Sequence, residues 1–228
     1  MCFSMAASVA AGTILLPGGG YCVAKAARHR KRYLALAAVP IFFGIQQLSE
    51  GLVWFGIGHG DPFLTRVGSL IFLFFALAWW PFWFPLMTAI MEPPSRLRKA
   101  ASVLALVAVS WFWILYVPIL TGPDSVLQTL IVQHSIVYDY HGLAIYHYVP
   151  RGLLRILYFL CVALPMVCAR TGLGRVPGLF FAGSAIVALG IYDYAFISVW
   201  CFFAAILSTY ICWVLAQLPA SDPSRENA

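Results

Sequence analysis

Long apolar segments separated by short polar turns constrain this chain more than any other feature. A helix needs about 20 mostly apolar residues to cross a bilayer, so a chain of 228 residues has room for about seven such helices with short loops. Only 10% of the residues are charged, whereas a soluble domain carries about 25%. The sequence therefore predicts an all-α integral membrane protein, a heptahelical bundle. The expected spans are residues 3–24, 33–57, 63–91, 101–120, 149–169, 177–195 and 196–218.

The positive charges predict how the chain is oriented. The net charge of +6 could indicate nucleic-acid binding in a soluble protein, but here the basic residues stand in short clusters between apolar segments. With the N-terminus outside, every lysine and arginine except Arg66, Arg151 and Arg155 falls on the cytoplasmic side, as the positive-inside rule requires. We therefore expect the N-terminus outside, no nucleic-acid partner, and a disordered cytoplasmic tail at residues 220–228.

One long loop, residues 121–148, falls outside the membrane between the fourth and fifth spans. Apolar and polar residues alternate between Leu130 and Tyr140 with the period of a β-strand. His141 and Gly142 are a candidate turn, after which residues 144–149 would return as a second strand. Because an isolated hairpin is marginally stable in water, we expect a small extracytoplasmic cap that rests on the bundle.

Glu50 is the one carboxylate well inside an apolar segment. Gln46 and Gln47 lie one helical turn before it and share its face, and ionisable residues in spans often mark functional sites. A ligand, ion or proton site and a buried structural pair both agree with this pattern. Arg155 is the expected counter-charge for Glu50 or Asp193. The candidate ligand-binding residues are Glu50, Gln46, Gln47, Arg155, Asp193, Trp54 and Trp200.

Most of the histidines map to the predicted outer side. Together with a nearby aspartate they offer ligands that first-row metals accept, and local hydrogen bonds of loop histidines are the alternative. The candidate metal ligands are His141, Asp139, His147, His59 and His134. Six cysteines are present without a CxxC pair, and a disulfide between Cys2 and Cys201 is left open.

Three stretches carry a resemblance to known sequences: MCFS at residues 1–4, FGIQQLSEGLVW at residues 43–54 and FISVWCFFAA at residues 196–205. They resemble a bacterial family of multi-pass membrane proteins of unknown function, and the similarity runs over the whole chain. The resemblance implies a bacterial cytoplasmic-membrane protein and supplies no activity.

The leading functional hypothesis is a non-enzymatic protein that binds, senses or transports a small molecule at an outward-facing polar pocket around Glu50. One acid beside two amides, with few other catalytic groups, favours this hypothesis. The alternatives are a metal-dependent membrane enzyme acting at the outer leaflet and a structural subunit of a membrane complex. The lipid bilayer is the expected partner, no cofactor can be named, and self-association is left open.

Overall fold

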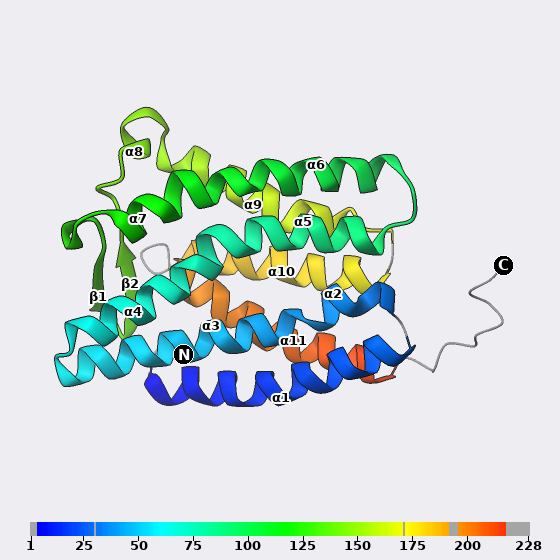
Figure 1. Cartoon of the computed structure of the whole chain (residues 1–228), viewed down its shortest axis with the longest axis horizontal. Helices are drawn as coiled ribbons and strands as arrows, with labels where there is room; N and C mark the ends of the chain where they lie inside the picture. Colours follow the sequence, from blue (N-terminus) through cyan, green and yellow to red (C-terminus); the bar gives the residue numbers. More distant parts are fainter. Residues whose placement is uncertain (1–3, 30, 171, 192–195, 218–228) are drawn as a thin grey trace.

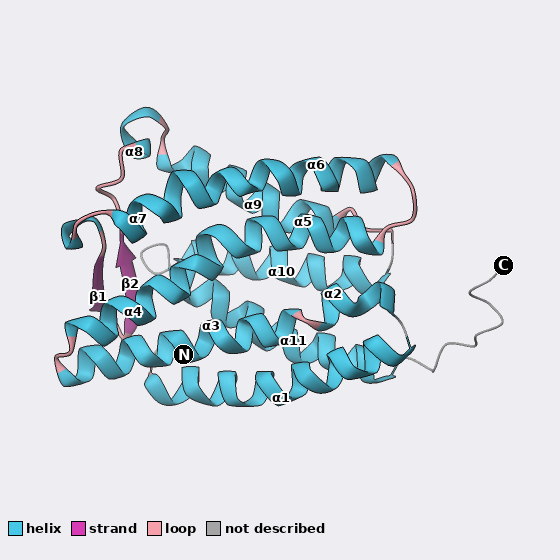
Figure 2. Ribbon diagram, viewed as in Figure 1, coloured by secondary structure: helices cyan, strands magenta, loops and turns pink. Residues whose placement is uncertain are grey.

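The computed structural model describes residues 4–29, 31–170, 172–191 and 196–217. Within these ranges the protein is a bundle of long helices with one small two-stranded sheet (Figures 1 and 2), which confirms the predicted all-α fold class and the hairpin cap. The first half comprises α1 (Met5–His29), η1 (Lys31–Tyr33), α2 (Leu34–Ala37), α3 (Val39–His59), α4 (Pro62–Leu73), η2 (Phe74–Trp79), α5 (Trp80–Met91), α6 (Arg96–Trp111), η3 (Phe112–Tyr116) and α7 (Val117–Thr121). The remainder comprises η4 (Asp124–Val126), β1 (Gln128–Val132), β2 (Ser135–Asp139), α8 (Ile145–Tyr148), α9 (Arg151–Val167), α10 (Gly172–Ile191) and α11 (Phe196–Gln217).

Several of these helices have the length and composition of membrane spans. In the described ranges, 5 helical segments are long and apolar enough to cross a membrane. Two further helices, α9 with 17 residues and α10 with 20, run beside them. Lengths and compositions of this kind indicate a membrane protein. The 5 segments are Met5–Arg28, Lys31–His59, Pro62–Met91, Arg96–Thr121 and Phe196–Gln217.

The two ends of the bundle differ in charge. The hairpin of β1 and β2 lies at one end, which we call the hairpin end, and the connections α1–α2, α5–α6 and α9–α10 lie at the opposite, basic end (Figure 1). Lys31, Arg32, Arg96, Arg98 and Arg170 are all in or beside these three connections. The fold thus gathers the basic turns on one side of the bundle, because consecutive long helices run antiparallel.

Proline explains where two of the long helical segments widen into π-helix. The π segment η2 ends two residues before Pro81, and η3 ends two residues before Pro118. A proline ring lacks an N–H and clashes with the carbonyl four residues earlier, and a π-bulge is a common accommodation. In η2 the carbonyl oxygen of Ala76 instead accepts a hydrogen bond from the Tyr158 hydroxyl at 2.6 Å.

The hairpin turns earlier than the sequence pattern suggested. Strands β1 and β2 are antiparallel, with Val132 opposite Ser135. The two loop residues, Gln133 and His134, have φ angles of 47° and 61°, as two-residue hairpin loops require to match the strand twist. The expected turn at residues 141–142 was therefore wrong, and Ile145–Tyr148 forms the short helix α8 rather than a second strand.

The hairpin is held by contacts with α4. Ile136 is fully buried, and the ring of Tyr138 stacks on Phe72 with 4.8 Å between ring centroids. The hydroxyls of Ser69 and Thr129 lie 2.9 Å apart, which joins β1 to the same helix. Strand β2 covers the bundle while β1 is mostly exposed, so the bundle supplies the support that an isolated hairpin lacks.

Candidate functional site

Glu50 joins three helices at the centre of the bundle. Its side chain is fully buried on α3. The Ser8 hydroxyl on α1 donates to Oε2 at 3.3 Å, and the Ser198 hydroxyl on α11 donates to Oε1 at 2.5 Å. Losing such donors at a buried group is costly. Glu50 therefore links α3 to α1 and α11 and places a carboxyl group inside the bundle.

Gln46 has a full set of partners from other helices. The indole N–H of Trp80 on α5 donates to Gln46 Oε1 at 2.8 Å. Gln46 Nε2 lies 3.3 Å from the sulfur of Cys201 on α11 and 3.5 Å from the carbonyl oxygen of Phe72 on α4. This agrees with the structural interpretation of Gln46, because its amide connects α3 to three neighbours.

Gln47 differs from both of these neighbours. Its side chain is fully buried, yet neither Oε1 nor Nε2 has a hydrogen-bond partner among the described protein atoms. Buried amides are usually satisfied, and leaving such a group unpaired costs about 1–3 kcal/mol. Of the three polar residues on this face of α3, Gln47 is thus the one whose side-chain hydrogen bonds the neighbouring helices do not supply.

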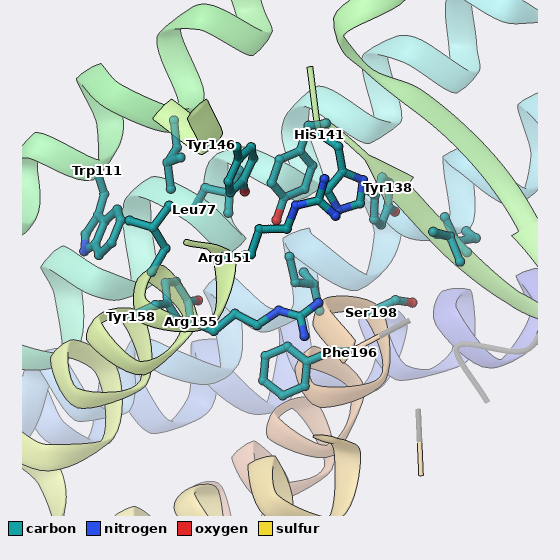
Figure 3. A pocket seen from close by; sticks show the side chains of 16 residues that line it. Leu77, Trp111, Tyr138, His141, Tyr146, Arg151, Arg155, Tyr158, Phe196 and Ser198 are labelled. Carbon is teal, nitrogen blue, oxygen red and sulfur yellow. The ribbon is translucent and has the colours of Figure 1, made fainter. Parts of the chain in front are cut away.

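A cavity lies at the hairpin end, between β2, α8, α9 and α11 (Figure 3). Its volume is about 120 Å³. Its apolar walls are Leu77, Trp111, Leu115, Ile136, Val137, Leu154, Phe196 and Ile197. Its polar side chains are Tyr138, Tyr140, His141, Tyr146, Arg151, Arg155, Tyr158 and Ser198.

The cavity is electropositive. Arg151 and Arg155 stand one turn apart at the start of α9, where the helix dipole adds positive potential. The guanidinium carbon of Arg151 lies 5.5 Å from the ring centroid of Tyr146, a cation–π distance. None of the described residues that line the cavity is acidic.

The surroundings of one aspartate and two tyrosines near the cavity determine their protonation states. The backbone N–H of His141 donates to Asp139 Oδ1 at 2.9 Å and, with the His141 ring, lowers the pKa of Asp139. This carboxylate therefore stays ionised and is engaged by His141. Burial raises the pKa values of Tyr140 and Tyr146, so their hydroxyls remain protonated near neutral pH.

Ser198 connects the cavity with Glu50. Its side chain is on the cavity wall and its hydroxyl donates to the carboxylate. Glu50, Gln46 and Gln47 do not line the cavity. The sequence predicted one polar pocket around Glu50. The described structure instead has a buried polar group, formed by Glu50, Gln46 and Gln47, and a separate cavity whose lining includes Arg155. Ser198 belongs to the cavity wall and bonds to Glu50, so it links the two.

The remaining candidates for ligand binding have varied surroundings. Trp200 is buried, donates from its indole N–H to the Phe181 carbonyl oxygen at 3.2 Å, and stacks on Phe196, so it backs the cavity wall. Trp54 packs into a hydrophobic cluster and does not line the cavity. Asp193 lies outside the described residues. Cys2 also lies outside them, and Cys201 is a buried free cysteine.

The histidines are dispersed. His59 Nδ1 lies 2.9 Å from the carbonyl oxygen of Phe55, one turn earlier on the same helix, and His134 is in the hairpin turn. His147 is exposed on α8, and only His141 of the predicted metal ligands lines the cavity. Among the described residues no three His, Cys, Asp or Glu side chains come together as a metal group. The metal-site hypothesis stays a prediction without support from the geometry.

Sequence reasoning missed several cavity residues. It set apart Arg155 but not Arg151, although two arginines four residues apart share a helix face in an otherwise apolar segment. Ser198, Tyr146 and Phe196 had no comparable signal, because single serines and aromatics are common in membrane helices. They become cavity residues only when α8, α9 and α11 are brought together.

These features define a helical membrane protein with a capped, cationic cavity at one end of its bundle. The chain belongs to a family of unknown function (DUF6629), whose family model matches residues 1–225. This agrees with the resemblance to an uncharacterised family. No curated protein and no solved structure matches the chain.

Proposed function

We propose that this protein is a multi-pass protein of a bacterial cytoplasmic membrane that binds a small molecule in the cavity at its hairpin end. Binding would serve sensing or transport rather than catalysis. The observation that carries the proposal is the cavity itself, in which arginine, tyrosine and serine side chains converge between apolar walls. Ligand sites are typically concave and mostly apolar with a few convergent polar groups.

Glu50 is proposed as the acid beneath this site. It acts through Ser198, whose hydroxyl it holds in position at the cavity wall. Replacing Glu50 with Gln keeps the size of the side chain but turns one accepting oxygen into an N–H₂ donor, so Ser8 and Ser198 can no longer each donate to a separate oxygen. We expect Glu50→Gln to weaken ligand binding; if binding and expression are both unchanged, the assignment of Glu50 fails.

A pair of variants on one helix tests the cavity. Leu154 lines the cavity, whereas Leu157 on the same helix is 45% exposed and does not line it. Leu154→Trp should fill the cavity, and Leu157→Trp makes the same change on the outside of α9. Both are compared with the unaltered protein in a thermal-shift screen of small molecules in detergent.

A ligand at 100 times its Kd stabilises the folded state by about 2.7 kcal/mol. We expect compounds that stabilise the unaltered protein and Leu157→Trp but not Leu154→Trp. If every stabilising compound acts equally on both variants, the cavity is not the binding site and the proposal is wrong.

The proposed topology has its own test. The basic end should face the cytoplasm, since most lysines and arginines lie there. Reporter fusions at the C-terminus and in the connection between α5 and α6 should report the cytoplasm, and a tag inserted between Gln133 and His134 should be accessible from outside. A C-terminal reporter and a hairpin tag in the same compartment would overturn this orientation.

A further inference from the structure

We propose that the cavity selects an amphiphilic anion: a molecule with a carboxylate or phosphate head and an apolar or aromatic body. The inference rests on the proposed function, because it names the chemistry of the ligand for the same cavity. It is carried by the way cationic and apolar side chains are distributed along the cavity.

Three polar residues of α9 line the cavity at successive positions along the helix. Arg151 begins the helix beside the hairpin, Arg155 follows one turn later, and Tyr158 is a further turn along. At 1.5 Å per residue, Arg151 and Tyr158 are about 10 Å apart along the axis. Figure 3 shows Leu77 and Trp111 at one side of the cavity and His141 at the other. We call the side with His141 and the Arg151 guanidinium the polar end, and the side with Leu77 and Trp111 the apolar end.

The polar end is built for an anionic head. Arg151 forms no ion pair with any residue in the described ranges, and Asp139, the acid whose charge reaches it, is engaged by His141. A guanidinium group binds a carboxylate or phosphate through two parallel hydrogen bonds. Arg155 has a further interaction within the protein, so we assign the direct contact to Arg151 and a supporting positive field to Arg155.

The apolar end accepts the body of the ligand. Leu77 and Trp111 form this part of the wall, and burying their apolar surface against an apolar group instead of water is favourable. An ammonium ligand would be repelled by the two arginines, and a small hydrophilic anion would leave the apolar wall without a partner. A molecule with an anionic head and an apolar body matches both the arginines and the apolar wall.

A matched series of three probes tests this preference. Hydrocinnamate, hydrocinnamamide and phenylpropylammonium share a phenyl body and carry a negative, a zero and a positive charge at neutral pH. Their binding to the purified full chain in an uncharged detergent is measured by titration calorimetry. Because hydrogen bonds to charged groups are stronger than neutral ones, we expect the carboxylate to bind about tenfold more tightly than the amide, or better. The ammonium should bind most weakly.

Two arginine variants locate the preference. Arg151→Gln should reduce the advantage of the carboxylate over the amide to about twofold or less, since the charged donor is gone. Arg66→Gln is the control: Arg66 is also at the hairpin end, but it pairs with Asp124 at 3.0 Å and does not line the cavity. Equal losses in both variants would mean that the overall charge, and not the cavity, attracts the anion, and would overturn the inference.

The outcomes separate this inference from the proposed function. If carboxylate and amide bind equally well and Leu154→Trp weakens both, the anion preference is wrong while the cavity remains a binding site. If none of the three probes binds, the anion inference is overturned, and the thermal-shift screen decides the proposed function independently.

Competition identifies the source of the anion. In nanodiscs of phosphatidylcholine, added phosphatidylglycerol should weaken hydrocinnamate binding if the natural ligand is a membrane lipid. Inorganic phosphate or soluble organic phosphates should compete instead if the ligand comes from water. Either competition supports the anionic head, provided that Arg151→Gln abolishes it; competition that persists in Arg151→Gln contradicts the assignment.

Discussion

Two glycines of α3 should respond in opposite directions to the same substitution. A Cβ atom at Gly56 would lie 2.6 Å from the backbone nitrogen of Thr65 and 2.6 Å from its Oγ1, whereas a Cβ at Gly58 would meet nothing within 4 Å. Gly56→Ala therefore forces α3 and α4 apart, and overpacking of this kind costs about 1–3 kcal/mol. Gly58→Ala only removes backbone freedom from the unfolded chain, which stabilises a helix by about 0.5–1 kcal/mol.

Thermal unfolding of both variants in detergent gives the comparison. At about 2–4 °C per kcal/mol for a chain of this size, Gly56→Ala should lower the Tm by about 2–12 °C. Gly58→Ala should raise the Tm by about 1–4 °C. Because one of the close atoms is a backbone nitrogen, the double variant Gly56→Ala with Thr65→Ala should recover little of the loss. Equal Tm values for Gly56→Ala and Gly58→Ala would refute the close approach of α3 and α4.

Three further predictions concern single side chains. Trp80→Phe removes the donor to Gln46 Oε1 and should lower the free energy of unfolding by about 1–3 kcal/mol; a Tm equal to that of the unaltered protein would contradict this hydrogen bond. Tyr158→Phe removes the hydrogen bond to the widened turn at Ala76 and should cost about 1 kcal/mol, measured in the same assay. Burial raises the pKa of Tyr140 above its ordinary value of 10.0, so its contribution to stability is complete below that pH and is lost as the pH rises through the folded-state pKa. The Tm should therefore fall less steeply above about pH 10 in Tyr140→Phe than in the unaltered protein; identical slopes would count against it.

The sequence was most informative where the physical cause is local. The length of an apolar segment is set by the thickness of the bilayer, so spans can be recognised without knowing their neighbours. The same holds for Glu50, Gln46 and Gln47, because helical periodicity alone puts them on one face. All three are fully buried, as a polar face inside a bundle must be.

The hairpin shows where local reasoning failed. Alternation predicted a strand, and β2 with its buried Ile136 is such a strand. The turn was misplaced because Gln133 and His134 adopt left-handed backbone angles without a glycine to announce them. Tyr138 of β2 stacks on Phe72 of α4, and β2 also contacts α11; these contacts hold the hairpin on the bundle and are not visible in the chain order.

The sequence by itself indicated a lipid environment, a helical fold and basic residues clustered in the turns at one end of the bundle. These properties follow from runs of neighbouring residues. The tertiary structure alone decided that Ser8 and Ser198 meet at Glu50, and that the start of α9 faces β2 and α11 across a cavity. Such sites join residues far apart in the chain, and their geometry depends on how the helices pack against one another, which no local pattern encodes.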